Sequence, residues 1–344
     1  MQSSNGNRSL KLVAIGGGTG LSTLLSGLKR FVAAQEHQTS LESLSAIVTV
    51  SDDGGSSGRL REELQMLPPG DIRNCMIALS EDSSLLSRLF RYRFRGSGDL
   101  AGHSFGNLFL AALTEVTGDF VEAVRLSSEV LASKGHIYPA TVSDVRLVAE
   151  LDDGRTVHGE TQITAARSAI RSLWLEPEHC LPLPEAIAAI HFADVITVGP
   201  GSLFTSIIPN LLVAKVADAI GESQSIKIFV SNLMTQPGET DGYDLGRHLE
   251  TVRDYAPQIQ FDYVIINNRN ISGDQAELYR ADGAYQVCVE DHIADVLRTR
   301  GTEVVGADLL DLGEMVRHNS ERLAQVVIEC AAKARTQPAL ALQS

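Results

Sequence analysis

The chain has little of several residue types that mark common protein classes. Its 344 residues include only four cysteines, at Cys75, Cys180, Cys288 and Cys330, and no C-x-x-C pair. Such sparse cysteine argues against a disulfide framework and against a structural zinc site. No apolar stretch reaches the roughly 20 residues needed to cross a bilayer, and residues 1–9 lack the apolar core of a signal peptide. We therefore expect a cytoplasmic protein without membrane insertion.

Positive charge is also scarce. Lysine and arginine total 29 against 43 aspartate and glutamate residues, which gives a net charge of −14. Nucleic acids and anionic membranes bind basic faces, so neither is expected as a partner. The chain is 44% hydrophobic, enough for a substantial core.

No activated nucleophile is evident. No cysteine has an assigned histidine partner, and the metalloprotease pattern H-E-x-x-H does not occur. Hydrolase chemistry therefore has no positive support from the sequence.

The chain does contain five apolar runs that each end in a small, polar loop. The runs and their loops are Leu10–Ile15 before Gly16–Gly20, Ala46–Val50 before Ser51–Gly58, Ala193–Val198 before Gly199–Ser202, Ile226–Val230 before Ser231–Thr240, and Tyr263–Ile266 before Asn267-Asn268. In an open parallel α/β sheet the loops that follow strands share the carboxyl edge, where ligands bind. The pattern predicts a doubly wound, mostly parallel α/β fold whose five loops form one crevice.

Two segments interrupt this alternation. Residues 71–134 show only helical periodicity and predict a helical insertion. Residues 137–175 predict a small β-hairpin element, because Asp152-Asp153-Gly154-Arg155 separates two strand-like runs. We expect one folded domain over 10–333, with flexible ends at 1–9 and 334–344. Helices are expected at 184–191, about 209–220, 243–252, 275–280 and 319–333. Apolar faces in the insertion fit a homodimer contact or core packing equally well.

Two glycine turns are candidates for phosphate binding. Gly17, Gly18, Thr19 and Gly20 precede a helix, but they have neither the Rossmann G-x-G-x-x-G spacing nor a P-loop lysine. Glycines still let the backbone approach a phosphate, and the helix N-terminus favours an anion. Gly201 and Ser202 can form a second backbone nest. Two such turns suit a ligand with a pyrophosphate, or two phosphorylated ligands.

Polar residues elsewhere complete the candidate crevice. Asp52 and Asp53 could accept ribose hydroxyls or hold Mg²⁺ against a phosphate, and the sequence leaves both open. Ser56 and Ser57 follow them in the same loop. Asp71 is expected to cap a helix whose first turn directs Arg73 and Asn74 to the crevice. His103 and Asn107 open a further helix and are expected to contact the ligand.

Six of these motifs, taken in order, resemble one family. They are Ile15–Gly20, Val50–Gly58, Gly70–Asn74, His103–Asn107, Gly199–Leu203 and Asn232–Thr240. The chain resembles the bacterial YvcK-type gluconeogenesis-factor family, within the wider superfamily of the 2-phospho-L-lactate transferase CofD. The resemblance implies a Rossmann-like fold that binds a UDP-sugar such as UDP-N-acetylglucosamine, with Asn232 and Thr235 in the last motif. It further implies that Tyr279 and Arg317 contact the nucleotide sugar; Tyr279 could stack on uracil and Arg317 could pair with the pyrophosphate.

Two functions from different classes follow. The first is a regulator that links gluconeogenic carbon metabolism to envelope-precursor supply and cell shape, requires no cofactor, and reports nucleotide-sugar levels to a protein partner. The second is an Mg²⁺-dependent, CofD-like transferase of a phospholactyl-type group from a nucleotide diphosphate donor. The Gly-Asp-Arg-Asp stretch of that branch is missing here. NAD could occupy the same crevice, because it also carries a pyrophosphate and ribose.

Overall fold

The computed structural model describes residues 8–34, 39–81 and 85–334. Its ten strands are β1 (Arg8–Gly16), β2 (Thr39–Val48), β3 (His136–Pro139), β4 (Arg146–Leu151), β5 (Thr156–His158), β6 (Ile170–Glu176), β7 (Val195–Val198), β8 (Ile226–Val230), β9 (Tyr263–Asn267) and β10 (Glu303–Ala307). The helices before β7 are α1 (Gly18–Leu28), η1 (Lys29–Phe31), α2 (Gly55–Leu64), α3 (Gly70–Leu79), α4 (Leu85–Arg91), α5 (Phe105–Thr117), α6 (Phe120–Val130), α7 (Glu160–Ala166) and α8 (Pro184–Phe192). Those after it are the π-helical turn η2 (Leu203–Ile207), α9 (Ile208–Leu212), α10 (Val216–Glu222), α11 (Leu245–Tyr255), α12 (Gly273–Ala281), α13 (Asp291–Thr299) and α14 (Ser320–Ala334).

The main sheet has the order β10-β9-β8-β7-β1-β2-β3, and every neighbouring pair is parallel. This is the doubly wound order, which reverses direction at β1. The central strands β1, β7 and β8 are mainly apolar and buried because helices cover both of their faces. The α/β prediction is confirmed.

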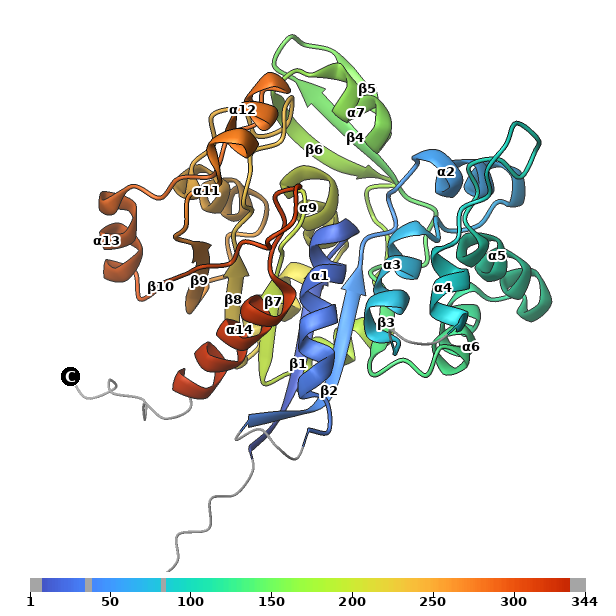
Figure 1. Ribbon diagram of the computed structural model, residues 1–344, viewed down its shortest axis with the longest axis horizontal. Helices are drawn as coiled ribbons and strands as arrows, with labels where there is room; N and C mark the ends of the chain where they lie inside the picture. The colour runs from blue at the N-terminus through green and yellow to red at the C-terminus, as the bar shows by residue number, and fades with distance from the viewer. Residues whose placement is uncertain (1–7, 35–38, 82–84, 335–344) are drawn as a thin grey trace, which may run out of the picture.

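Helices α1, α3 and α14 pack together on one face, where α1 and α14 lie side by side in front of the sheet (Figure 1). Because the strand order reverses, the helices that follow β7 and β8 belong to the opposite face. The stripe Leu21, Leu24, Leu25 and Leu28 is fully buried and seats α1 on the sheet. Among the described residues, no single helix combines the length and apolar character needed to cross a membrane, although the bent pair Leu203–Leu212 and Val216–Glu222 does so jointly.

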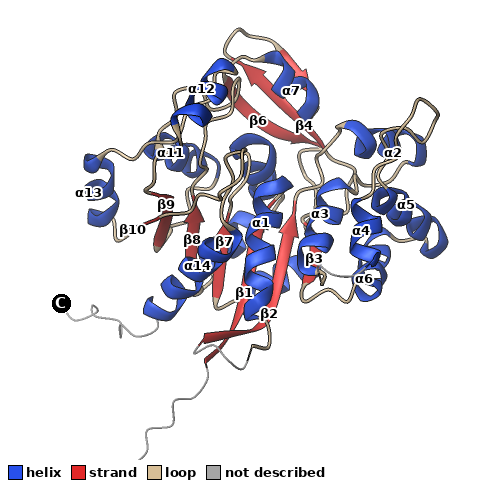
Figure 2. Ribbon diagram, viewed as in Figure 1, coloured by secondary structure: helices blue, strands red, loops and turns tan. Residues whose placement is uncertain are grey.

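The small antiparallel sheet has the order β5-β4-β6. With α7 it lies over the carboxyl ends of the main strands (Figure 2). The predicted hairpin is confirmed, since β4 pairs antiparallel with β5 across the Asp152–Arg155 turn. The element is smaller than 137–175, however, because β3 pairs with β2 in the main sheet.

Other boundaries also differ from expectation. The expected helical insertion contains α3 to α6. The helix expected at about 209–220 is broken into α9 and α10, with Lys215 at φ +64° between them. The expected flexible ends lie mostly outside the described residues, but Arg8 and Ser9 belong to β1 and Ala334 belongs to α14.

Candidate functional site

The two glycine turns meet where the sheet reverses direction. The first follows β1 and the second follows β7, and these strands are neighbours. A Cβ atom on Gly20 would lie only 2.5 Å from the carbonyl oxygen of Pro200. Only glycine permits this approach, so the two turns form one continuous wall at the switch point.

The first turn is fixed by bonds from three other segments. The Gly16 carbonyl accepts bonds from the Thr49 backbone N–H at 3.1 Å and from Asn210 Nδ2 at 2.9 Å. The Gly18 N–H donates to Asp71 Oδ2 at 2.7 Å, and Gly18 has a φ of +61°. The N-cap residue of α1, Gly17, provides no side-chain bond, and Asp71 supplies the carboxyl group that accepts the Gly18 N–H at the positive end of the helix.

A cavity of about 400 Å³, which we call the loop cavity, opens at this point. Eight of the predicted site residues line it: Thr19, Gly20, Gly201, Ser202, Asn232, Thr235, Tyr279 and Arg317. The remaining lining is mainly apolar and includes Pro200, Leu233, Met234 and Pro237. The structure therefore gathers residues from three predicted loops and from two late segments into one cavity.

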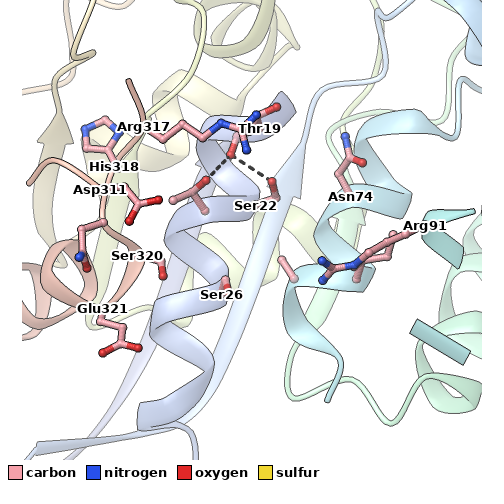
Figure 3. A pocket seen from close by; sticks show the side chains of 14 residues that line it. Thr19, Ser22, Ser26, Asn74, Arg91, Asp311, Arg317, His318, Ser320 and Glu321 are labelled. Atoms are coloured by element: carbon pink, nitrogen blue, oxygen red, sulfur yellow. Dashed lines mark hydrogen bonds between the residues drawn. The ribbon is translucent and has the colours of Figure 1, made fainter. Parts of the chain in front are cut away.

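A second cavity of about 500 Å³, which we call the α1 groove, runs along the outer face of α1. It shares Thr19, Thr23, Arg317 and His318 with the loop cavity. Asn74, another predicted residue, lines its opposite wall (Figure 3). Burial lowers the pKa of His318 to about 4, so its ring is neutral near pH 7. Arg317 supplies the positive charge that both cavities share.

Tyr279 and Arg317 are linked through the backbone. The Val316 N–H donates to Tyr279 Oη at 3.0 Å. The segment from Asp311 to Arg317 forms a turn that is closed by a hydrogen bond of 2.9 Å from the Asp311 N–H to the Arg317 carbonyl. Helix α12 therefore holds the turn that presents the Arg317 side chain.

Four other predicted residues form a buried network instead of lining either cavity. Arg73 donates to Asn107 Oδ1 at 2.8 Å and also to Ser104. Asn107 Nδ2 donates to Ser56 Oγ at 3.1 Å, and Ser56 Oγ lies 2.9 Å from His103 Nδ1. The network ties α2, α3 and α5 together. Burial, followed by the charge of Arg59, lowers the pKa of His103, which favours a neutral ring.

Ser56 qualifies the expectation that the chain contains no activated nucleophile. It lies in the spacing Gly54-x-Ser56-x-Gly58, which is the pattern of a nucleophile elbow, and it has a histidine partner. Both side chains are only 4% exposed, and neither residue lines the two cavities. An elbow serine must present its oxygen to substrate, so this pair has the spacing of a nucleophile without the access.

Asp52 and Asp53 point to different partners. Asp53 Oδ1 accepts bonds from the Thr161 N–H at 2.8 Å and from Thr161 Oγ1 at 2.7 Å, at the start of α7. Asp52 Oδ1 accepts the Gly54 N–H at 2.8 Å. Gly17 and Ser57 are buried or packed beside this region, against Thr49 and Gly70 respectively. Asp53 is bonded to α7 and Asp52 to its own loop, so an Mg²⁺ ion held by either carboxylate would need phosphate oxygens to complete its ligands.

Several carboxyl side chains lie near one another beside Asp52. Partial burial, reinforced by the charges of Asp52 and Asp71, raises the pKa of Glu160 to about 9. Burial and the charge of Asp52 raise the pKa of Asp71 to about 6. Burial also raises the pKa of Glu239, whose carboxylate accepts bonds from Ser202 Oγ at 2.6 Å and Thr164 Oγ1 at 3.0 Å. Within the described part of the chain, no group of three or more His, Cys, Asp or Glu residues is arranged to hold a metal ion.

Several functional positions were not expected from the sequence. Asp71 does not cap α3, whose N-cap is Pro69; it lies in the first turn and fixes Gly18 instead. Glu160 comes from α7, and no local motif contained it; Glu239 lies in the motif Asn232–Thr240 but was not selected as a site residue. The hydroxyls of α1 did carry a signal, because Thr19, Ser22, Thr23 and Ser26 recur at helical spacing.

Comparison with known proteins assigns the chain to a family. A family model described as 2-phospho-L-lactate transferase CofD matches residues 12–310. The chain belongs to this family. A relative from Nostoc sp. is 48% identical over 325 residues, covering 94% of this chain and 69% of the relative. The protein named gluconeogenesis factor in Bacillus subtilis is 42% identical over 320 residues, covering 93% of this chain and 97% of that protein.

A crystal structure of a Bacillus halodurans protein has a TM-score of 0.87 and 41% identity, and the match covers 93% of this chain and all of that one. The resemblance to the gluconeogenesis factors within the CofD family is confirmed. The CofD match includes both glycine turns, Asp52 and Tyr279, but ends before Arg317. The α1 groove is therefore walled partly by residues outside the region matched to CofD.

Proposed function

We propose that this protein binds a nucleotide sugar of the UDP-N-acetylglucosamine type in the cytoplasm and acts as a regulator. In this role it links gluconeogenic carbon metabolism to envelope-precursor supply and cell shape, through a protein partner. The observation that carries the proposal is that the two glycine turns, Tyr279 and Arg317 line one cavity at the switch point of the sheet.

The lining supports each part of such a ligand. Tyr279, Met234 and Pro237 offer surfaces for a planar base. The N-terminus of α1 and Arg317 offer positive charge for a pyrophosphate. Asn232 is already oriented, since its Oδ1 accepts the Gly201 N–H at 3.2 Å.

Binding without turnover is supported by the bonding and burial of the serine hydroxyls that could act as nucleophiles. Ser202 is held by Glu239, and the Ser56–His103 pair is buried. The alternative is CofD-like transfer, which is favoured by the family match and by the group of carboxyl side chains beside Asp52. In that case Mg²⁺ bound by Asp52 would supply charge neutralisation to a diphosphate donor.

Calorimetric titration tests the proposal. Purified protein is titrated with UDP-N-acetylglucosamine, with and without Mg²⁺, and with NAD and GDP for comparison, and the samples are then analysed for products. Micromolar binding without products is expected. Arg317→Ala should weaken binding by at least about tenfold, because a charge-assisted bond to phosphate is lost. Arg322→Ala, a matched exposed arginine of α14, should not. Mg²⁺-dependent product formation would establish the transferase instead, and failure of the UDP-sugar to bind would overturn the proposal.

A further inference from the structure

The outer face of α1 is unusual for a helix enclosed by neighbours. Thr19, Ser22, Thr23 and Ser26 place four hydroxyls on one stripe, at spacings of three and four residues. Helices α3 and α14 pack against α1 on either side. The outward face of a surface helix usually carries charged and other polar residues; here it carries a stripe of small hydroxyl side chains, and this stripe lines the α1 groove.

Two of these hydroxyls have fixed positions. Ser22 Oγ donates to the Thr19 carbonyl at 3.0 Å and Thr23 Oγ1 donates to it at 2.8 Å (Figure 3). Their hydrogens are used in these bonds, so their oxygens are presented to the groove as acceptors. Asn74 and Asn319 add amide donors and acceptors from the walls.

The groove carries charges of both signs. Arg317 and Arg91 approach it from opposite sides (Figure 3). Asp311 and Glu321 also line it. An anionic group of the ligand, other than the pyrophosphate, would be repelled by both carboxylates in this groove. An uncharged group rich in hydroxyls can form hydrogen bonds with every part of the lining.

The two cavities lie in a definite chemical order. The loop cavity is mainly apolar, the junction holds the start of α1 and Arg317, and the α1 groove is polar. Resting on the function proposed above, we infer that the α1 groove is the subsite for the neutral, polyhydroxylated sugar of the nucleotide sugar. Ser22 and Ser26 then determine specificity for the sugar, and the loop cavity holds the nucleoside.

If the sugar binds in the α1 groove, the UDP-sugar should bind more tightly than UDP. Substitutions in the groove should remove this difference in affinity. Ser26→Leu fills the groove without touching the loop cavity, and Ser22→Ala deletes a hydroxyl without adding volume. Affinities for UDP and for UDP-N-acetylglucosamine are measured by calorimetry on both variants. The control is Ser128→Leu, a half-buried serine in the last turn of α6 and far from the groove in sequence. Circular dichroism checks that each variant is folded.

We expect wild-type protein to bind the UDP-sugar more tightly than UDP. Ser26→Leu should lose about tenfold in affinity for the UDP-sugar, the loss expected for one or two hydrogen bonds, while its affinity for UDP stays within about twofold. Ser22→Ala should show a smaller loss of the same kind. Equal losses for both ligands, or no loss for either, would overturn the subsite while leaving nucleotide binding intact. If wild-type protein binds neither ligand, the proposed function itself fails, and the subsite fails with it.

Discussion

Asp71 Oδ2 accepts a hydrogen bond of 2.7 Å from the backbone N–H of Gly18, which lies 53 positions earlier in the chain. The pKa of this carboxyl is raised to about 6, first by burial and then by the charge of Asp52. The bond places a titrating group directly behind the turn that begins α1. Protonation there removes a negative charge from the proposed phosphate position.

Asp71→Asn keeps an oxygen acceptor and removes the charge. Since the folded pKa is raised, the contribution of Asp71 to stability is present at low pH and is lost as pH rises towards and through about 6. We expect Asp71→Asn to raise the free energy of unfolding at pH 7.5 by on the order of 2 kcal/mol, with little gain at pH 4. Urea unfolding at both pH values measures this. Asp99→Asn, an exposed aspartate, is the control, and an equal effect of Asp71→Asn at both pH values would contradict the argument.

Glu160 gives a second pH-dependent prediction. Its pKa of about 9 means that the folded protein holds a proton at neutral pH that the unfolded chain releases. The associated stability is therefore lost progressively as pH rises from the ordinary carboxyl value through about 9. Glu160→Gln should raise the melting temperature at pH 7.5, and by more at pH 9. Thermal unfolding across this range measures it; a melting temperature that falls in Glu160→Gln at pH 9 would show that the ionised carboxylate is the stabilising form.

Tyr279→Phe removes the acceptor for the Val316 N–H and leaves the aromatic ring in place. The turn that presents Arg317 then loses one anchor, at a cost of about 1 kcal/mol for a single neutral hydrogen bond. Affinity for UDP-N-acetylglucosamine should fall about fivefold, with the melting temperature nearly unchanged. The control is Tyr285→Phe, since Tyr285 is half exposed just beyond α12. Wild-type affinity in Tyr279→Phe would show that the hydroxyl has no role in binding.

Asp53→Ala tests a structural role against a metal-binding one. Asp53 accepts two bonds from Thr161 at the start of α7, so its loss should cost about 1 kcal/mol of stability, as for a helix cap. Ligand affinity, and any effect of Mg²⁺ on it, should be unchanged. Asp119→Ala removes the N-cap of α6 and provides a reference for the capping loss. Loss of an Mg²⁺ effect in Asp53→Ala would place Asp53 at the metal.

Much of the sheet could be predicted because parallel strands buried on both faces are continuous apolar runs. The five runs correspond to β1, β2, β7, β8 and β9. Two strands were not recognised. His136–Pro139 is short and adjoins the antiparallel element in sequence. Glu303–Ala307 lies at the sheet edge, contains Gly306, and is not fully buried, so its pattern is weak.

The site was predictable where a loop follows a strand, and less so where partners are far apart in the chain. Nothing near Asp53 in the sequence indicates that Thr161 would contact it. In the same way, the polar residues around Arg73 and His103 indicated a polar cluster, but not whether their side chains face the crevice or one another. The structure shows that these side chains mainly bond to one another. Local sequence records which groups are polar, whereas their orientation depends on contacts between distant segments.

The first strand of the chain occupies the middle of the sheet, between β2 and β7. During synthesis β2 follows β1 soon after it leaves the ribosome, but β7 ends only at Val198. Until then one edge of β1 has no partner, and exposed edges pair readily with other chains. A truncated product that ends before Val198 therefore lacks the second glycine turn and also carries an edge prone to aggregation. The order of the strands thus makes formation of the second glycine turn coincide with closure of that edge.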